Sequence, residues 1–155
     1  MTNNDILRQL RYTFDFSDDK MIEIFAMADI ITTRAKVSNW LKKFEDADYL
    51  EMLDVELAIF LNGFIILKRG KKEDSSPIPE NFLNNNAILK KLKIALNLRS
   101  DDIIEVFRLV NKVIGEHEIT AFLRNHKQTQ YRAFNDQYLR NFLHGLQLKY
   151  RPKNN

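Results

Sequence analysis

The chain has 155 residues, of which 45% are hydrophobic and 29% are charged, a balance typical of a folded protein rather than a disordered one. It contains no cysteine, which excludes disulfides and cysteine-based zinc sites and favours a reducing compartment, so we expect a cytoplasmic protein. The opening residues show no secretory signal, and the longest apolar run, residues 64–67, is far too short to span a bilayer, which argues against any membrane association.

The net charge of +3 is distributed unevenly along the chain. Residues 1–84 carry 11 basic and 15 acidic side chains, a net of −4, whereas residues 85–155 carry 13 and 6, a net of +7. Such asymmetry is typical of a polyanion-binding half, but it also suits halves or protomers of opposite sign that pack together, and charged helix faces are commonly just solvated.

The first part of the chain shows four segments with helical periodicity. The first begins behind the candidate N-caps Asn3 and Asn4, and the second follows Ser17, an N-cap succeeded by two acids that suit the helix dipole. A short turn leads to the third helix, which ends near Lys43, and Asp54 caps the fourth. Their apolar stripes include Ile6, Leu7, Leu10, Phe14, Met21, Ile22, Ile24, Phe25, Val37, Trp40, Leu41, Leu57, Phe60, Leu61, Phe64 and Ile65.

The same pattern returns 82 residues later. When residues 3–69 are aligned with residues 85–151, 17 of the 67 pairs are identical and no gap is needed. We therefore predict a tandem duplication, with a linker rich in Gly, Pro, Ser and charge between the copies. The predicted boundaries are a first helical repeat over 1–69, a linker over 70–84, a second repeat over 85–152 and a tail over 153–155.

The predicted fold class is all-α, because strand signals are weak throughout. Each repeat is a four-helix unit with a helix-turn-helix-like element, and we expect a pseudo-two-fold relation between the copies. Units of this size could each pack a small core or could pair as a pseudo-dimer.

No pattern of catalytic or metal-binding residues is found. His117, His126 and His144 lack ligand spacing and are better explained as solvated or capping groups. The chain has only four glycines and shows neither a phosphate-binding loop nor a nucleophile elbow. The acid pairs that follow Ser17 and Ser100 are explained by helix capping. We therefore expect a protein that is not an enzyme and that needs no metal and no cofactor.

Gly63 and its equivalent Gly145 lie inside predicted helices, where glycine costs roughly 1 kcal/mol relative to alanine. We expect close helix–helix packing at both positions, and the alternative is a shallow groove for a partner helix.

Residues 33–43, TRAKVSNWLKK, resemble the second helix of a DNA-binding helix-turn-helix. Val37, Trp40 and Leu41 point inward on such a helix, whereas a polar row suitable for phosphate and base contacts points outward. The candidate nucleic-acid contacts in this row are Arg34, Lys36, Asn39, Lys42 and Lys43.

Three observations weaken this interpretation. The spacing from Ala26 to Val37 is one residue too long, and the turn lacks its usual glycine. In the second copy, Glu116 and Glu118 replace two of the basic residues and would repel phosphate. We therefore interpret the segment as a core helix with a basic outer face.

The second copy carries its positive charge elsewhere, on its first helix and on or after its last. This is the alternative surface for a polyanion or for a partner helix. Its residues are Lys90, Lys91, Lys93, Arg140, Lys149 and Arg151.

The chain resembles the YehS-like family of uncharacterised bacterial proteins, which are built from two copies of a domain of unknown function. The resemblance covers nearly the whole chain and implies a bacterial cytoplasmic protein, but it brings no known activity or functional residue. It rests on MTNNDILR (1–8), SDDKMIE (17–23), VSNWLKK (37–43), FLNG (60–63), KRGKKE (68–73) and LRNFLHGLQ (139–147).

The function that these patterns favour is a non-enzymatic helical protein-interaction module with an unknown protein partner. The alternative is a nucleic-acid-binding or regulatory protein that uses its basic helix faces on DNA or RNA. A homodimer is compatible with either.

Overall fold

The computed structural model describes residues 1–72 and 77–153, and parts of the predicted linker and tail, residues 73–76 and 154–155, lie outside this description. The described residues form eight α-helices and no strand, which confirms the all-α prediction. The helices are α1 (Asn3–Phe14), α2 (Asp18–Met27), α3 (Arg34–Leu41), α4 (Asp54–Arg69), α5 (Asn85–Ala95), α6 (Ser100–Arg108), α7 (Glu116–Leu123) and α8 (Asp136–Tyr150).

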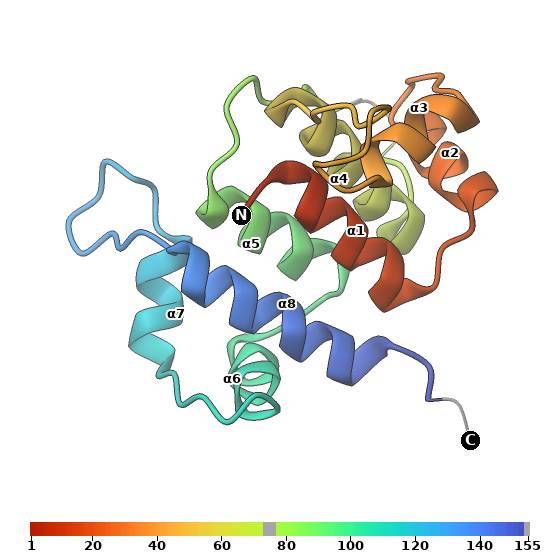
Figure 1. Cartoon of the computed structure of the whole chain (residues 1–155). Helices are drawn as coiled ribbons and strands as arrows, with labels where there is room; N and C mark the ends of the chain where they lie inside the picture. Colours follow the sequence, from red (N-terminus) through yellow and green to blue (C-terminus); the bar gives the residue numbers. More distant parts are fainter. Residues whose placement is uncertain (73–76, 154–155) are drawn as a thin grey trace.

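The two halves of the chain share one hydrophobic core. Within each half, the second helix packs on the third and the fourth, α2 on α3 and α4 and α6 on α7 and α8. Between the halves, α1 lies along α8 and α4 lies along α5 (Figure 1). These two pairs are equivalent at the offset of 82, so the first helix of each half packs on the last helix of the other.

Of three predicted helix ends, one is confirmed and two differ from expectation. Ser17 is confirmed as an N-cap, because its side-chain oxygen accepts a hydrogen bond from the Lys20 backbone N–H at 3.1 Å. Ser100, in contrast, is the first residue of α6, and the N-cap is Arg99. The third helix ends at Leu41, two residues before the predicted end, because Lys42 turns into an extended conformation.

Asn3, Asn4 and Asp54 are not N-caps, and their predicted role was wrong. Thr2 caps α1, and Leu53 occupies the cap position of α4. The three polar side chains are instead used in tertiary contacts. Asn3 Nδ2 donates to Asp54 Oδ1 at 2.7 Å, which ties the start of α1 to the start of α4.

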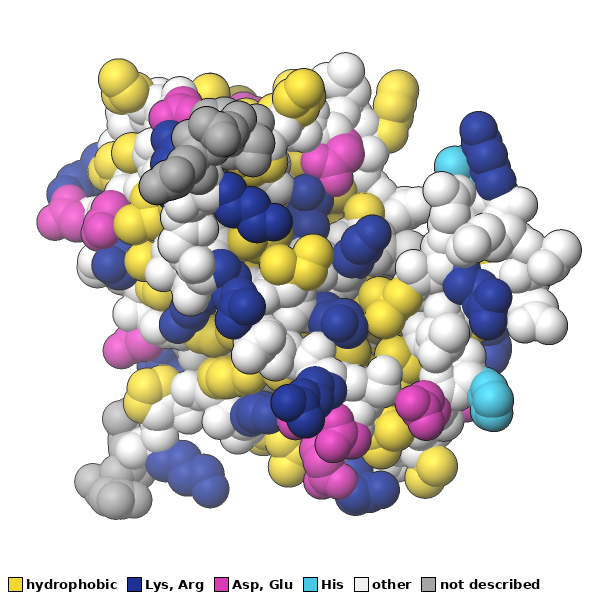
Figure 2. Space-filling model, turned by 180° about the vertical axis from the view of Figure 1, so that it is seen from behind, with side chains coloured by type: hydrophobic (Ala, Val, Ile, Leu, Met, Phe, Trp, Pro, Cys, Tyr) yellow, Lys and Arg dark blue, Asp and Glu magenta, His cyan; other side chains and the backbone are white. Residues whose placement is uncertain are grey.

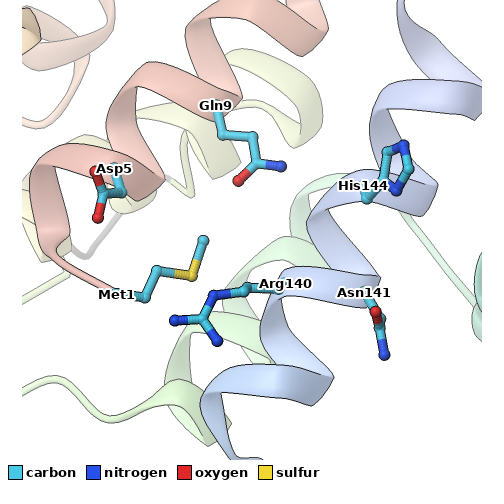
Figure 3. A pocket seen from close by; sticks show the side chains of 6 residues that line it. All are labelled: Met1, Asp5, Gln9, Arg140, Asn141 and His144. Carbon is cyan, nitrogen blue, oxygen red and sulfur yellow. The ribbon is translucent and has the colours of Figure 1, made fainter.

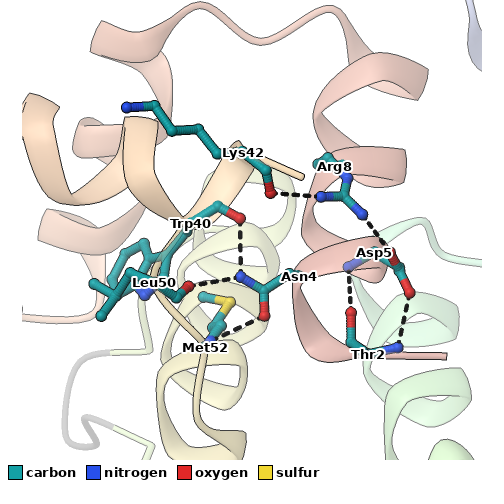
Figure 4. A network of polar contacts seen from close by, with 8 residues as sticks. All are labelled: Thr2, Asn4, Asp5, Arg8, Trp40, Lys42, Leu50 and Met52. Atoms are coloured by element: carbon teal, nitrogen blue, oxygen red, sulfur yellow. Dashed lines mark hydrogen bonds and ion pairs between the residues drawn. The ribbon is translucent and has the colours of Figure 1, made fainter. Parts of the chain in front are cut away.

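Asn4 is a buried polar residue, 1% exposed, that anchors the loop between α3 and α4. Its Nδ2 donates to the carbonyl oxygens of Trp40 at 2.9 Å and Leu50 at 2.8 Å, and its Oδ1 accepts from the Met52 N–H at 2.9 Å (Figure 4). Buried backbone groups need such partners, so one side chain satisfies three of them.

Asn86 repeats this arrangement in the second half of the chain. Its Nδ2 donates to the carbonyl oxygens of Phe122 at 2.9 Å and Arg132 at 2.8 Å, and its Oδ1 accepts from the Phe134 N–H at 2.9 Å. Every partner lies 82 residues after its counterpart in the first half.

The two helical glycines allow close helix crossings, as predicted. A Cβ atom at Gly63 would lie 2.0 Å from the carbonyl oxygen of Ile24, so α4 and α2 touch there through their backbones. A Cβ atom at Gly145 would lie 2.3 Å from the carbonyl oxygen of Val106, where α8 crosses α6. Close packing therefore explains both residues, and neither lines a vacant groove for a partner helix at its crossing.

Candidate functional site

The basic row of α3 is largely neutralised by acids of the same half. Arg34 pairs with Asp19 and lies 3.6 Å from a carboxylate oxygen of Asp18. Lys36 Nζ lies 3.5 Å from Glu56 Oε2 and 5.2 Å from the centre of the Trp40 ring.

The end of the row shows the same compensation. Lys42 Nζ donates to Asn39 Oδ1 at 3.1 Å and lies 3.5 Å from Asp48 Oδ2. Lys43 is exposed and makes no ion pair with another described residue. Among the described residues, Lys43 is therefore the one cation of this row without an acidic partner.

The alternative basic set does not form one surface. Lys90 and Lys91 line a groove between α4 and α5, whereas Arg140 lines a different groove between α1 and α8. Arg151 pairs with Asp15 at 3.1 Å and donates to the carbonyl oxygen of Tyr12 at 2.6 Å. The remaining two residues, Lys93 and Lys149, line neither groove.

The groove between α4 and α5, which we call the basic groove, has a volume of about 630 Å³. Its apolar lining comes from Ile65, Ile66, Pro77, Ala87 and Ile94. Lysine and arginine side chains surround hydrophobic ones on the face seen in Figure 2. The cations that line the groove are Arg69, Lys71, Lys72, Lys90 and Lys91.

Two of these cations have acidic partners within the described part of the chain, and three do not. Lys91, whose side chain is 14% exposed, donates to the buried Asn62 Oδ1 at 2.7 Å and pairs with Glu80 at 3.0 Å. Lys71 Nζ lies 3.6 Å from a carboxylate oxygen of Asp29. Within the described residues, no ion pair involves the exposed side chains of the remaining three, Arg69, Lys72 and Lys90.

Sequence reasoning found Lys90 and Lys91 but missed the cations on the α4 side. Arg69, Lys71 and Lys72 belong to the half with a net negative charge, so counting charge along the chain hid them. The run KRGKK at 68–72, which ends a helix and precedes the linker, was the available signal.

The equivalent groove between α1 and α8 has different chemistry. It has a volume of about 450 Å³, and its lining includes Asp5, Gln9, Arg140 and His144 (Figure 3). Gln9 stands where the basic groove has Lys91, and the exposed His144 stands where it has the buried Asn62. In the described part of the chain, no three His, Cys, Asp or Glu side chains are placed to hold a metal ion.

Asp136, at the start of α8, has a lowered pKa. Its carboxylate accepts hydrogen bonds from Asn85 Nδ2 at 2.8 Å and from the Met1 ammonium at 3.1 Å, and these hold its pKa below the usual 3.8. The folded state therefore favours the ionised form of Asp136. The stability that this carboxylate contributes is fully present above its unfolded pKa and is lost as the pH falls through its lower folded pKa.

We expect Asn85→Ala to return the pKa of Asp136 towards 3.8, because the larger of these two hydrogen-bond effects is removed. The measurement is an NMR titration of the Asp136 carboxyl carbon. Asn141→Ala is the matched control, since Asn141 lies nearby on α8 and bonds to Gln137 instead. An unchanged midpoint in Asn85→Ala would contradict the assignment.

Comparison with known proteins identifies a family whose function is described as unknown. The family model described as "Protein of unknown function (DUF1456)" matches residues 3–70 and 85–151. The chain belongs to this family. It is 37% identical over 147 residues to "Uncharacterized protein YehS" of Escherichia coli (strain K12), and the match covers 94% of each protein. No solved structure matches.

The described residues contain no helix long and apolar enough to cross a membrane.

Proposed function

We propose that the chain is a non-enzymatic protein-interaction module that holds an acidic segment of a partner protein in the basic groove. The observation that carries this proposal is the combination of an aliphatic lining with three cations, Arg69, Lys72 and Lys90, that lack acidic partners in the described residues. An acidic segment with aliphatic or aromatic side chains satisfies both features, because its apolar groups cover the lining while its carboxylates meet the cations.

The architecture behind this groove is an internal duplication of a four-helix unit with pseudo-two-fold symmetry. The recurrence of the Asn4 contacts at Asn86 and of the Gly63 crossing at Gly145 supports it, as does the family match over two segments. In each copy the second and third helices form a helix-turn-helix-like element, and its role here is to complete the core.

A nucleic-acid function receives less support from the same contacts. The α3 row has acidic partners for Arg34, Lys36 and Lys42, and a phosphate would have to displace them. The basic groove has cations without acidic partners among the described residues, but its described lining offers no exposed aromatic ring for base stacking.

The test is the binding of a fluorescently labelled peptide of Asp, Glu and Leu, followed by anisotropy. We expect saturable binding that weakens on the order of tenfold in Lys72→Gln/Lys90→Gln, because two cations of the groove are neutralised. Lys43→Gln is the matched control, since it removes an exposed cation that has no ion pair with a described residue from the α3 surface and should leave the affinity unchanged.

Two outcomes would overturn the proposal. One is an affinity that falls in Lys43→Gln but not in the groove variant. The other is the absence of peptide binding together with tight binding of mixed duplex DNA that weakens steeply as salt rises, which would support the nucleic-acid function instead.

A further inference from the structure

The loop between α3 and α4 carries four of the 15 acidic side chains of residues 1–84. Glu45, Asp46, Asp48 and Glu51 are all exposed within residues 44–51, which we call the acidic loop. Phe44 is 80% exposed at its start, with its ring centre 5.5 Å from that of Tyr49. The loop therefore presents carboxylates beside an exposed aromatic side chain, which is the chemistry that the basic groove accepts.

The corresponding loop of the second half has the opposite character. At the offset of 82, Lys127 stands in place of Glu45, Gln128 in place of Asp46 and Gln130 in place of Asp48, and Ala133 replaces Glu51. The acidic loop and the basic groove thus each lack an equivalent of the same charge at the offset of 82, although the backbone repeats. Both departures from internal symmetry point to the same pairing of charges.

The acidic loop of a molecule is far from its own basic groove. The loop precedes Asp54, the first residue of α4, whereas the groove begins at Asn62 and extends to the end of that helix. From residue 54 the helix rises about 12 Å to the first groove residue, 62, and about 18 Å to residue 66. The loop is also held at the start of α1 by the hydrogen bond from Asn4 to the carbonyl oxygen of Leu50, so it cannot fold back along α4.

We infer that the segment bound in the basic groove is the acidic loop of a second copy of this chain. The inference rests on the proposed function of the groove and names its partner. The acidic loop and the basic groove are different surfaces of the molecule. The loop of one molecule therefore meets the groove of another, which is a head-to-tail contact. A loop of eight residues buries a small area, so the association is weak, concentration-dependent and sensitive to salt.

Two variants separate the surfaces. Glu45→Lys/Glu51→Lys reverses two exposed carboxylates that make no ion pair in the described residues, and so the fold is not at risk. Lys72→Gln/Lys90→Gln neutralises the groove. In sedimentation velocity at low salt, we expect the unmodified chain to self-associate and each variant alone to do so at least tenfold more weakly.

A mixture of the two variants gives the decisive measurement. The groove variant still has its acidic loop, which can bind the intact groove of the loop variant. The reverse contact, between the lysines of the loop variant and the neutralised groove, lacks charge attraction. The mixture should therefore form one-to-one dimers that do not grow, and these should dissociate in high salt.

A chain that stays monomeric at low salt and high concentration would overturn the inference, as would self-association that the loop variant leaves unchanged. The labelled acidic peptide distinguishes the two proposals. If the peptide binds the groove of a monomeric chain, the proposed function stands and the partner is another protein. If neither the peptide nor a second copy binds, both proposals fail.

Discussion

Replacement of Gly63 by alanine is expected to lower the free energy of unfolding by about 3 kcal/mol, at the upper end of the usual cost of overpacking. The new Cβ would lie 2.0 Å from the carbonyl oxygen of Ile24 and 2.9 Å from its carbonyl carbon, so α4 must move away from α2. The sign of this change in stability tests the crossing, since alanine in an open helix interior would stabilise the protein by roughly 1 kcal/mol. Gly145→Ala should behave alike, because Val106 Cγ1 would lie 2.6 Å from the new atom.

Urea denaturation followed by circular dichroism measures this effect. Gly115→Ala is the control, because a Cβ at this N-cap would meet only Glu118 Oε1, at 3.9 Å. Its cost should stay below about 1 kcal/mol, the usual loss at a capping position. A stability that rises in Gly63→Ala would show that α2 and α4 do not touch at this crossing.

Asn4→Ala should be destabilising to a similar degree. It leaves three backbone groups without a partner, the carbonyl oxygens of Trp40 and Leu50 and the N–H of Met52. A buried polar group that loses its hydrogen bond costs about 1–3 kcal/mol, and water can reach some of these groups, so we expect a total loss of about 3–4 kcal/mol.

The measurement is again the free energy of unfolding in urea. Asn39→Ala is the matched control, because that side chain accepts a hydrogen bond from Lys42 in a half-buried position, and its loss should cost under about 1 kcal/mol. Equal stabilities of Asn4→Ala and Asn39→Ala would contradict the anchoring role of Asn4.

The helices could be predicted from the sequence because their signals are local. Apolar spacing and the offset of 82 identified four helices per half, and the cost of glycine inside a helix pointed to the crossings at Gly63 and Gly145. The N-caps at Asn3, Asn4 and Asp54 were predicted wrongly for a physical reason. These side chains instead form hydrogen bonds with loops and helices far along the chain, which a local pattern does not contain.

The candidate site was less predictable, because charge compensation depends on tertiary packing. The row on α3 looks basic in sequence, but Asp19, Glu56 and Asp48 reach it from other elements. The basic groove was missed for the converse reason. Arg69 and Lys90 are far apart in sequence and belong to halves of opposite net charge, and only the packing of α4 on α5 brings them to one groove.

The first helix of each half packs on the last helix of the other half, and this has a consequence for biosynthesis. Because α1 lies along α8, with Met1 near Asp136 and Tyr12 near Arg151, α1 lacks its main packing partner during synthesis until α8 has been made. The side of α1 that packs on α8 stays uncovered during elongation. The nascent chain therefore cannot finish folding half by half, and its final cooperative step awaits the release of α8.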